Sequence, residues 1–290
     1  MTDSNLLTIK INLILLFTLL LIHTSLYAAE SHFESDLFKD TNLTSHCHDT
    51  VASWELPATH YYPYEANRVL WVQAKTTRET LEALVPKPLK INEENKIVFF
   101  IGRLNIIQPS PDPYNEGGIV IPVTYTDSDT GELKNSVFIP ILYLDENNPI
   151  IGGRVIYGAN KYPAEINIIE TENTVSARVN KSGVTLIDMT VTLQDQVIDT
   201  DTNQDSGGWI AIKCNSTSNL ENAKYDTLSL ADVSKLKIHE LHIGEGELKL
   251  GTSKLDPLAK IPILEITSAG FQIDSSILGN SIVIHKYKHD

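Results

Sequence analysis

The sequence has 290 residues, of which 42% are hydrophobic and 21% charged, and a formal net charge of −14 at pH 7. This composition is typical of a globular protein and excludes a fibrous or wholly disordered chain. The acidic balance argues against nucleic acid and anionic membrane surfaces as partners, but it is compatible with a small anionic substrate.

The N-terminus has the pattern of a secretory signal. An apolar run from Ile11 to Ile22 follows Lys10 and leads to Ala28 and Ala29, the candidate cleavage positions. The run is shorter than the roughly 20 residues that a membrane helix needs. We therefore predict that residues 1–29 are a signal peptide and that the mature protein is secreted or periplasmic, without a membrane anchor. An uncleaved N-terminal anchor is the alternative.

Residues 30–60 are polar and irregular, and we expect them to form an arm or linker before one domain over 61–290. Cys47 lies in this arm and Cys214 in the domain. An exported chain with an even number of cysteines permits a disulfide. The sequence leaves a bridge and two separate thiols equally open.

The domain is predicted to open with a strand over 69–75. Thr76 and Glu79 form a capping-box pattern, so a short helix should follow, and Pro86 and Pro88 should end it near Val85. Asp127 to Gly131 has turn chemistry. Apolar runs of strand length predict further strands at 96–101, 119–125, 137–144, 150–157, 165–171, 175–179, 184–193, 209–213, 236–243, 248–251, 263–267 and 282–287.

So many short strands between turn signals indicate a mainly β fold with a few short helices. The architecture that they favour is an antiparallel β-barrel or a double sheet. The chain has no internal repeat and no domain-splitting linker after residue 60. One β-rich domain is therefore expected.

Two motifs carry a resemblance to a known family. The first is Tyr114-Asn-Glu-Gly-Gly118, followed by Ile121-Pro-Val123; the second is Gly153-Arg154, followed by Lys161-Tyr162-Pro163. They resemble the Tyr-x-Glu-x-Gly turn and the lysine-bearing turn of the acetoacetate decarboxylase family. Further segments fit in the same order: Leu84–Leu89, Leu142–Leu144, Ile238–Glu240 and Asp256–Leu258. The resemblance implies an acetoacetate decarboxylase-like fold and a homo-oligomer.

The same resemblance places the Schiff-base lysine of the family on Lys161. A neutral amine can form an imine with the carbonyl of a β-keto acid, and the protonated imine then withdraws electrons from the bond that breaks. This chemistry needs no cofactor or metal. The simpler interpretation of Lys161 alone is a solvated turn lysine.

Glu116 matches the glutamate of the Tyr-x-Glu motif. Its carboxylate would disfavour the carboxylate of a bound substrate or relay a proton. An exposed hairpin carboxylate is the alternative. The resemblance thus predicts Lys161 and Glu116 as catalytic residues, and it places Arg68, Ile101, Tyr114 and Tyr162 at the substrate.

The sequence also departs from the family pattern. A second glutamate of the family falls on Ile101, its active-site arginine on Asn67 with Arg68 one position on, and its second lysine on Tyr162. Without that second cation, burial would have to lower the pKa of Lys161. The expected function is a Schiff-base lyase acting on a β-keto acid or related oxo acid. Aldolase or dehydratase chemistry through the same lysine, and an exported protein that only binds a small ligand, are the alternatives.

Two segments with metal-binding residue types are not expected to bind metal. Asp199 to Asp205 begins like a calcium loop, but Gln204 stands where glycine is needed and Ile210 where a bidentate glutamate is needed. His46 to Asp49 lies in the predicted arm without a partner pair.

Overall fold

The computed structural model describes residues 35–44, 61–107, 112–127, 130–197, 203–204, 207–215 and 224–287. The predicted signal peptide, Cys47, His46 to Asp49 and most of the calcium-like loop lie outside these residues. Within them, no helix has the length and apolar character needed to cross a membrane.

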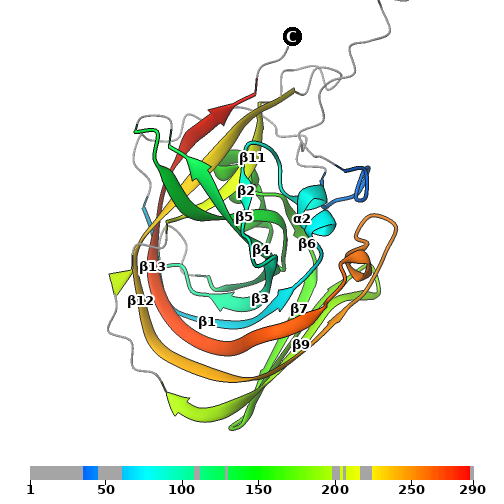
Figure 1. The fold of residues 1–290 in the computed structure, drawn as a ribbon. Coiled ribbons are helices and arrows are strands. Elements are labelled where there is room, and N and C mark those ends of the chain that lie inside the picture. The colour runs from blue at the N-terminus through cyan, green and yellow to red at the C-terminus, as the bar shows by residue number, and fades with distance from the viewer. Residues whose placement is uncertain are drawn as a thin grey trace, which may run out of the picture. The chain divides into compact units, whose positions relative to one another are not determined.

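The domain is built on strands that close a ring (Figure 1). The hydrogen-bonded order is β11-β5-β4-β3-β1-β13-β12, and β12 pairs again with β11. These strands are β1 (Tyr62–Lys75), β3 (Lys96–Leu104), β4 (Tyr114–Thr126), β5 (Leu133–Leu144), β11 (Trp209–Asn215), β12 (Lys224–Leu250) and β13 (Glu265–Lys286). The predicted mainly β architecture with a few short helices is confirmed.

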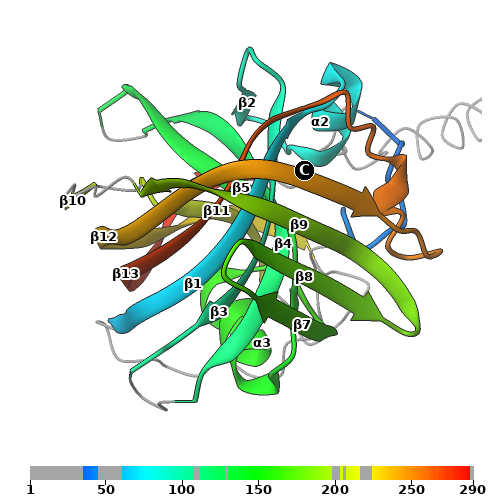
Figure 2. The ribbon, with the colours of Figure 1, turned by 90° about the horizontal axis from the view of Figure 1, so that it is seen from below.

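A second group of strands extends from β12. Figure 2 shows β9 (Val184–Val197), β8 (Thr174–Lys181) and β7 (Glu165–Glu170) side by side, in the order β12-β9-β8-β7. Three short strands pair elsewhere: β2 (Lys90–Ile91) with β4, β6 (Lys161–Pro163) with β5, and β10 (Asn203–Gln204) with β12. The sheet is mostly antiparallel, but β6 and β11 both run parallel to β5.

Several predicted elements differ from the observed ones in length. The strands predicted over 236–243 and 248–251 both overlap the single strand β12, which ends at Leu250, and those over 263–267 and 282–287 both overlap β13, which spans Glu265–Lys286. Helix α2 (Arg78–Leu84) is capped by Thr77, whose hydroxyl accepts from the Thr80 amide. The capping box predicted at Thr76 is therefore wrong by one residue.

The strand predicted over 150–157 is wrong. This segment is helical: α3 (Asn147–Gly152) continues into a π-helix, η1 (Gly153–Tyr157), that ends at Gly158 with φ 75°. Its β-branched residues gave the strand-like pattern. Pro149, in the first turn, lacks only an amide hydrogen that would have no helical partner there. A 3-10 turn, η3 (Leu258–Lys260), is the remaining helical element among the described residues.

The register of β3, β4 and β5 sorts side chains onto two faces of the sheet. Ile101 lies opposite Gly117, whereas Gly102 lies opposite Glu116, and residues paired in this way share a face. The face with Ile101, Ile119 and Ile121 belongs to the main hydrophobic core. The other face carries Glu116 and a smaller apolar cluster: Tyr114, Ile139, Leu142, Leu144, Ile150 and Ala159.

The described part of the predicted arm, residues 35–44, packs into the domain. Phe38 and Leu43 are fully buried members of the main core. The backbone N–H of Asn42 donates to the Leu255 carbonyl, with an N–O distance of 2.8 Å. Ten residues that the composition marked as an arm thus form part of the fold.

Cys214, near the end of β11, is disulfide-bonded. Cys47 is the other cysteine in the sequence and lies outside the described residues.

Candidate active site

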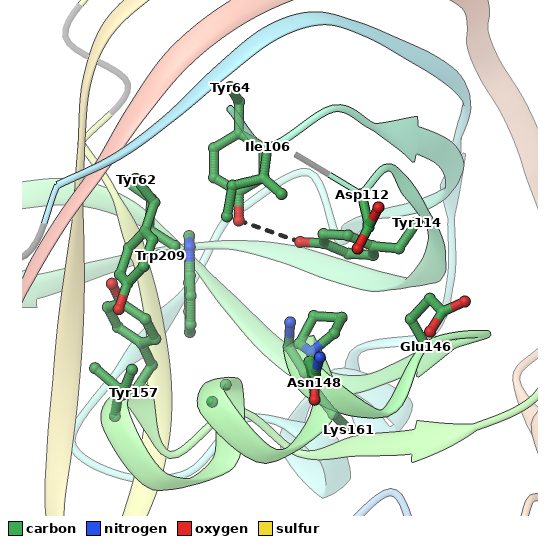
Figure 3. Close-up of a pocket in the computed structure, with 15 residues that line it drawn as sticks. Tyr62, Tyr64, Ile106, Asp112, Tyr114, Glu146, Asn148, Tyr157, Lys161 and Trp209 are labelled. Atoms are coloured by element: carbon green, nitrogen blue, oxygen red, sulfur yellow. Dashed lines mark hydrogen bonds between the residues drawn. The ribbon is translucent and has the colours of Figure 1, made fainter. Parts of the chain in front are cut away.

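A cavity of about 250 Å³ lies on the Glu116 face of the sheet (Figure 3). Helices α3 and η1 form one wall, and the first residues of β1, β4 and β11 form others. Most of the lining residues are aromatic or aliphatic, and a few are polar. They are Tyr62, Tyr64, Ile106, Asp112, Tyr114, Glu146, Asn148, Pro149, Gly152, Gly153, Ile156, Tyr157, Lys161, Trp209 and Leu278.

Lys161 meets Glu116 at the edge of this cavity. The lysine Nζ donates to Glu116 Oε2 at 2.8 Å, and the two side chains are only 8% and 10% exposed. Strand β5 brings them together, because it pairs with β4 through Leu144 and Glu116 and with β6 through Leu142 and Lys161. A buried ion pair of this kind places an acid within proton-transfer distance of an amine.

The Gly153-Arg154 motif holds the lysine in place. A Cβ at Gly153 would lie 2.5 Å from Lys161 Cε and 2.6 Å from its Cδ, so this position has no room for a side chain. Arg154 donates from Nε to the Lys161 carbonyl at 2.7 Å, and its guanidinium lies 5.3 Å from the Tyr162 ring centroid. The first residue of the motif therefore makes room for the lysine side chain, and the second fixes the lysine backbone.

A buried hydrogen-bond network holds Asn160, the residue directly before Lys161 and strand β6. The Asn160 side chain donates to the carbonyls of Asn42 and Pro140 at 2.6 and 2.7 Å. Asn42 in turn donates to Asp256 Oδ1 at 2.8 Å, and Lys181 Nζ pairs with the same carboxylate at 2.9 Å. The N-terminal segment is thereby linked to the residue that precedes Lys161.

Two tyrosine hydroxyls face each other in the cavity wall. Tyr64 and Tyr114 are hydrogen-bonded at 3.2 Å (Figure 3). Burial raises the pKa of Tyr64 to about 12 and that of Tyr114 well above its usual value. Both phenols therefore stay protonated at neutral pH. Because two hydroxyls share one hydrogen bond, one O–H is left to donate to a ligand oxygen.

Comparisons with known proteins fit this site. The sequence profile described as "Acetoacetate decarboxylase (ADC)" matches residues 49–287. The chain belongs to the acetoacetate decarboxylase family. Two relatives in this family are acetoacetate decarboxylase 3 of Mesorhizobium japonicum, 27% identical over 79% of this chain and 87% of its own length, and the acetoacetate decarboxylase of Ralstonia nicotianae, 26% identical over 73% and 84%.

Two solved structures illustrate the similarity in fold. The acetoacetate decarboxylase of Legionella pneumophila is 20% identical, with a TM-score of 0.68 over 88% of this chain and 97% of that one. The enduracididine biosynthesis enzyme MppR, complexed with pyruvate, is 13% identical, with a TM-score of 0.64 over 82% and 94%.

Three residues that the family resemblance placed at the substrate are not among the described residues that line the cavity. Ile101 is fully buried in the main core, on the sheet face opposite Glu116. Arg68 is ion-paired with Glu170 and lies 5.2 Å from the Phe271 ring centroid. The Tyr162 ring centroid lies 5.3 Å from the Arg154 guanidinium and 4.4 Å from Lys181 Nζ. The described cavity lining includes none of them.

Other predicted and unpredicted residues do line the cavity. Lys161 and Tyr114 are among the lining residues, with Glu116 directly behind the lysine. Sequence reasoning missed Tyr62, Tyr157 and Trp209. Tyr157 lies between Gly153 and Lys161 of the second motif, which could have marked it as a cavity residue. The incorrect strand prediction over 150–157 prevented that assignment. Asn67, at the position of the family arginine, is buried and donates to Asp274 at 2.9 Å.

Proposed function

We propose that this protein decarboxylates a β-keto acid through an imine on Lys161, with Glu116 as the proton-transfer group. One observation carries the proposal: a buried lysine amine lies 2.8 Å from a buried carboxylate at the edge of a partly open, largely apolar cavity. Membership of the acetoacetate decarboxylase family supports the same chemistry.

In the proposed reaction, Lys161 first gives its extra proton to Glu116 and attacks the ketone carbon. Loss of water yields a protonated imine. The bond to the carboxylate then breaks, its electron pair forms the enamine, and carbon dioxide leaves. The enamine carbon takes up a proton, for which Glu116 is the proposed donor, and water hydrolyses the imine to release the ketone and the free amine.

The charges around the cavity support decarboxylation over aldol chemistry. Among the described lining side chains Lys161 is the one cation, whereas Asp112 and Glu146 contribute carboxylates at the exposed edge. An aldolase acting on an α-oxo acid retains the substrate carboxylate and needs a cation to hold it. A decarboxylase expels that group as neutral carbon dioxide, so anionic surroundings favour the reaction.

Aldolase or dehydratase chemistry through the same lysine is the second candidate. It is favoured by a departure from the family pattern next to the lysine, since Tyr162 stands where a second lysine is expected. The fold shared with MppR agrees with it but carries no information on the reaction of this chain.

Borohydride trapping with a panel of β-keto and α-keto acids tests the proposal. A β-keto acid should release carbon dioxide, and borohydride should fix one substrate-derived mass on the peptide that contains Lys161. The Lys161→Ala and Lys161→Arg variants should lose both turnover and trapping; the arginine variant keeps a cation beside Glu116 and controls for loss of the ion pair. A condensed or dehydrated product without carbon dioxide would favour the second candidate. An adduct confined to another lysine, or activity in both variants, would end the assignment.

A further inference from the structure

The cavity has two chemically different halves on either side of Lys161. Figure 3 shows Tyr62, Tyr157 and Trp209 together on one side of the lysine, and Tyr64 and Tyr114 on another. Leu278 is paired with Tyr62 across β1 and β13 and adds an aliphatic surface to the first group. We call Tyr62, Tyr157, Trp209 and Leu278 the aromatic half of the cavity.

In the aromatic half, Tyr157 presents its ring rather than its hydroxyl. The Tyr157 hydroxyl donates to the Gly279 carbonyl at 2.9 Å, so its polar end is already bonded to β13. Its ring lies 5.5 Å from the Trp209 ring at an interplanar angle of 53°. Tilted ring pairs of this kind are favourable, and they leave ring faces and edges that suit another flat ring.

This wall is fixed by its surroundings. Tyr157 is the last residue of η1, and Lys213 Nζ donates to the Ile156 carbonyl at 3.0 Å just before it. A Cβ at Gly158 would lie 2.6 Å from Lys213 Cα, so η1 ends in close contact with β11, the strand that carries Trp209. A wall held on both sides cannot collapse to fill the space beside it, so that space is available to a ligand.

The position of Lys161 orients a substrate between the halves. The ketone carbon must bond to Nζ, and a ketone carries two further groups. The arm with the carboxylate is polar and fits the side with the Tyr64–Tyr114 hydroxyl pair. The second group must then point toward the aromatic half. The cavity of about 250 Å³ corresponds to roughly eight water volumes, so a methyl group would leave the rings uncovered.

We propose that the substrate is a β-keto acid whose ketone carries a flat aryl group on a short linker in place of the methyl group of acetoacetate. This proposal rests on the function proposed above and specifies its substrate class. The aryl ring would occupy the aromatic half, and its contact with Trp209 would make the enzyme prefer an aryl-substituted acid to acetoacetate.

Turnover of a matched pair of acids tests the inference. Acetoacetate is compared with 3-oxo-4-phenylbutanoate, in which a methylene separates the ring from the ketone. For the full chain, kcat/KM should be about tenfold or more higher for the phenyl acid. Trp209→Ala should abolish that preference, whereas Trp209→Phe should retain most of it. Equal or better use of acetoacetate by the unaltered protein would overturn the inference while leaving the decarboxylase proposal intact.

A binding measurement tests the aromatic half without depending on whether Lys161 forms an imine. Phenylacetone and acetone, the neutral ketone products of the two acids, are titrated into the Lys161→Arg variant by calorimetry. Phenylacetone should bind at least about tenfold more tightly, and Trp209→Ala in the same background should remove the difference. Equal binding of the two ketones, or a preference that does not depend on Trp209, would overturn the assignment of the aromatic half even if Lys161 proves catalytic. Circular dichroism of each variant excludes misfolding as the cause of a loss.

Discussion

Gly153 and Lys161 are in direct contact, with no side chain between the backbone of η1 and the lysine methylenes. The backbone at Gly153 is ordinary right-handed helix, with φ −62°, so alanine would be conformationally acceptable there. Only the lysine forbids it, because a Cβ would lie 2.5 Å from Cε. Glycine at this position is therefore required by the neighbouring side chain and not by the backbone angle.

Gly153→Ala should displace the Lys161 amine from Glu116 and lower turnover and imine trapping by about tenfold or more, because small misplacements of a nucleophile are costly. Gly152→Ala is the matched control, since a Cβ there would meet only Ile156 Cδ1 at 3.9 Å. The control should still be trapped on Lys161. Trapping kinetics and thermal unfolding of both variants check the prediction, which would be wrong if the two behaved alike.

Glu116→Gln should separate capture from turnover. The amide keeps the size of the side chain but cannot supply a proton to the enamine, whereas Nζ can still lose its proton to solvent before it attacks. The variant should still form a borohydride-trapped adduct, while its turnover should fall by about 10²- to 10⁴-fold. Rapid-quench measurement of adduct formation and of carbon dioxide release distinguishes the two steps. Unchanged turnover would remove Glu116 from the mechanism.

Asp256 should be important for stability. It accepts hydrogen bonds from Asn42, Tyr143 and Lys181, and it is only 2% exposed. Asp256→Ala would leave the Lys181 ammonium without this partner, and breaking a partly buried pair costs about 3–5 kcal/mol.

The matched control for this prediction is Asp188→Ala. It breaks the pair with Arg178, in which the arginine side chain is 62% exposed, and should cost no more than about 1 kcal/mol. Urea denaturation of the two variants and the unaltered protein measures the difference. Equal losses of unfolding free energy in the two variants would show that the hydrogen bonds of Asp256 contribute little to stability.

Asp274 predicts a specific pH dependence. Burial raises the pKa of this carboxyl above its usual value of 3.8, although hydrogen bonds from Gln272 and Asn67 and the nearby His239 act in the opposite direction. A raised carboxyl pKa means that the folded protein binds the proton more tightly than the unfolded chain. The contribution to stability is therefore complete below the unfolded pKa and is lost as the pH rises through the folded pKa.

The unaltered protein should accordingly gain stability relative to Asp274→Asn as the pH falls from about 7.5 to about 4. The free energies of unfolding of both proteins at the two pH values provide the test. Repeating it with His239→Gln in both proteins removes the titration of the neighbouring imidazole. A difference that stays constant with pH, or moves in the other direction, would contradict the raised pKa.

Strand-length apolar runs and turn signals were sufficient for the mainly β architecture, because each run reflects local burial. They could not show that β12 and β13 are continuous strands, since the pairing of these two strands contains several bulges that interrupt the alternating pattern. The strand prediction for residues 150–157 was wrong for a different reason. Its β-branched residues favour a strand, whereas its observed contacts include Lys161 at Gly153 and Lys213 at Ile156, which lie later in the chain and which no local pattern contains.

The motif residues illustrate the same limit within the site. Lys161 and Glu116 could be proposed from their motifs, and the structure brings them together across β5. Ile101 could not be placed by counting along the sequence, because its strand register turns it to the face opposite Glu116. The aromatic half of the cavity comes from β1, η1, β11 and β13, so no local pattern could have assembled it.

The link from Asn160 through Asn42 to Asp256 has a consequence for biosynthesis. A ribosome that has made the chain up to residue 250 has already supplied Lys161, Glu116 and the rings of Tyr62, Tyr157 and Trp209. It has not supplied Asp256, to which Asn42 donates, or β13, which pairs with β1. Contacts between such distant parts of a chain form late and slowly. We therefore expect the nascent chain to remain inactive until almost the whole polypeptide has been made.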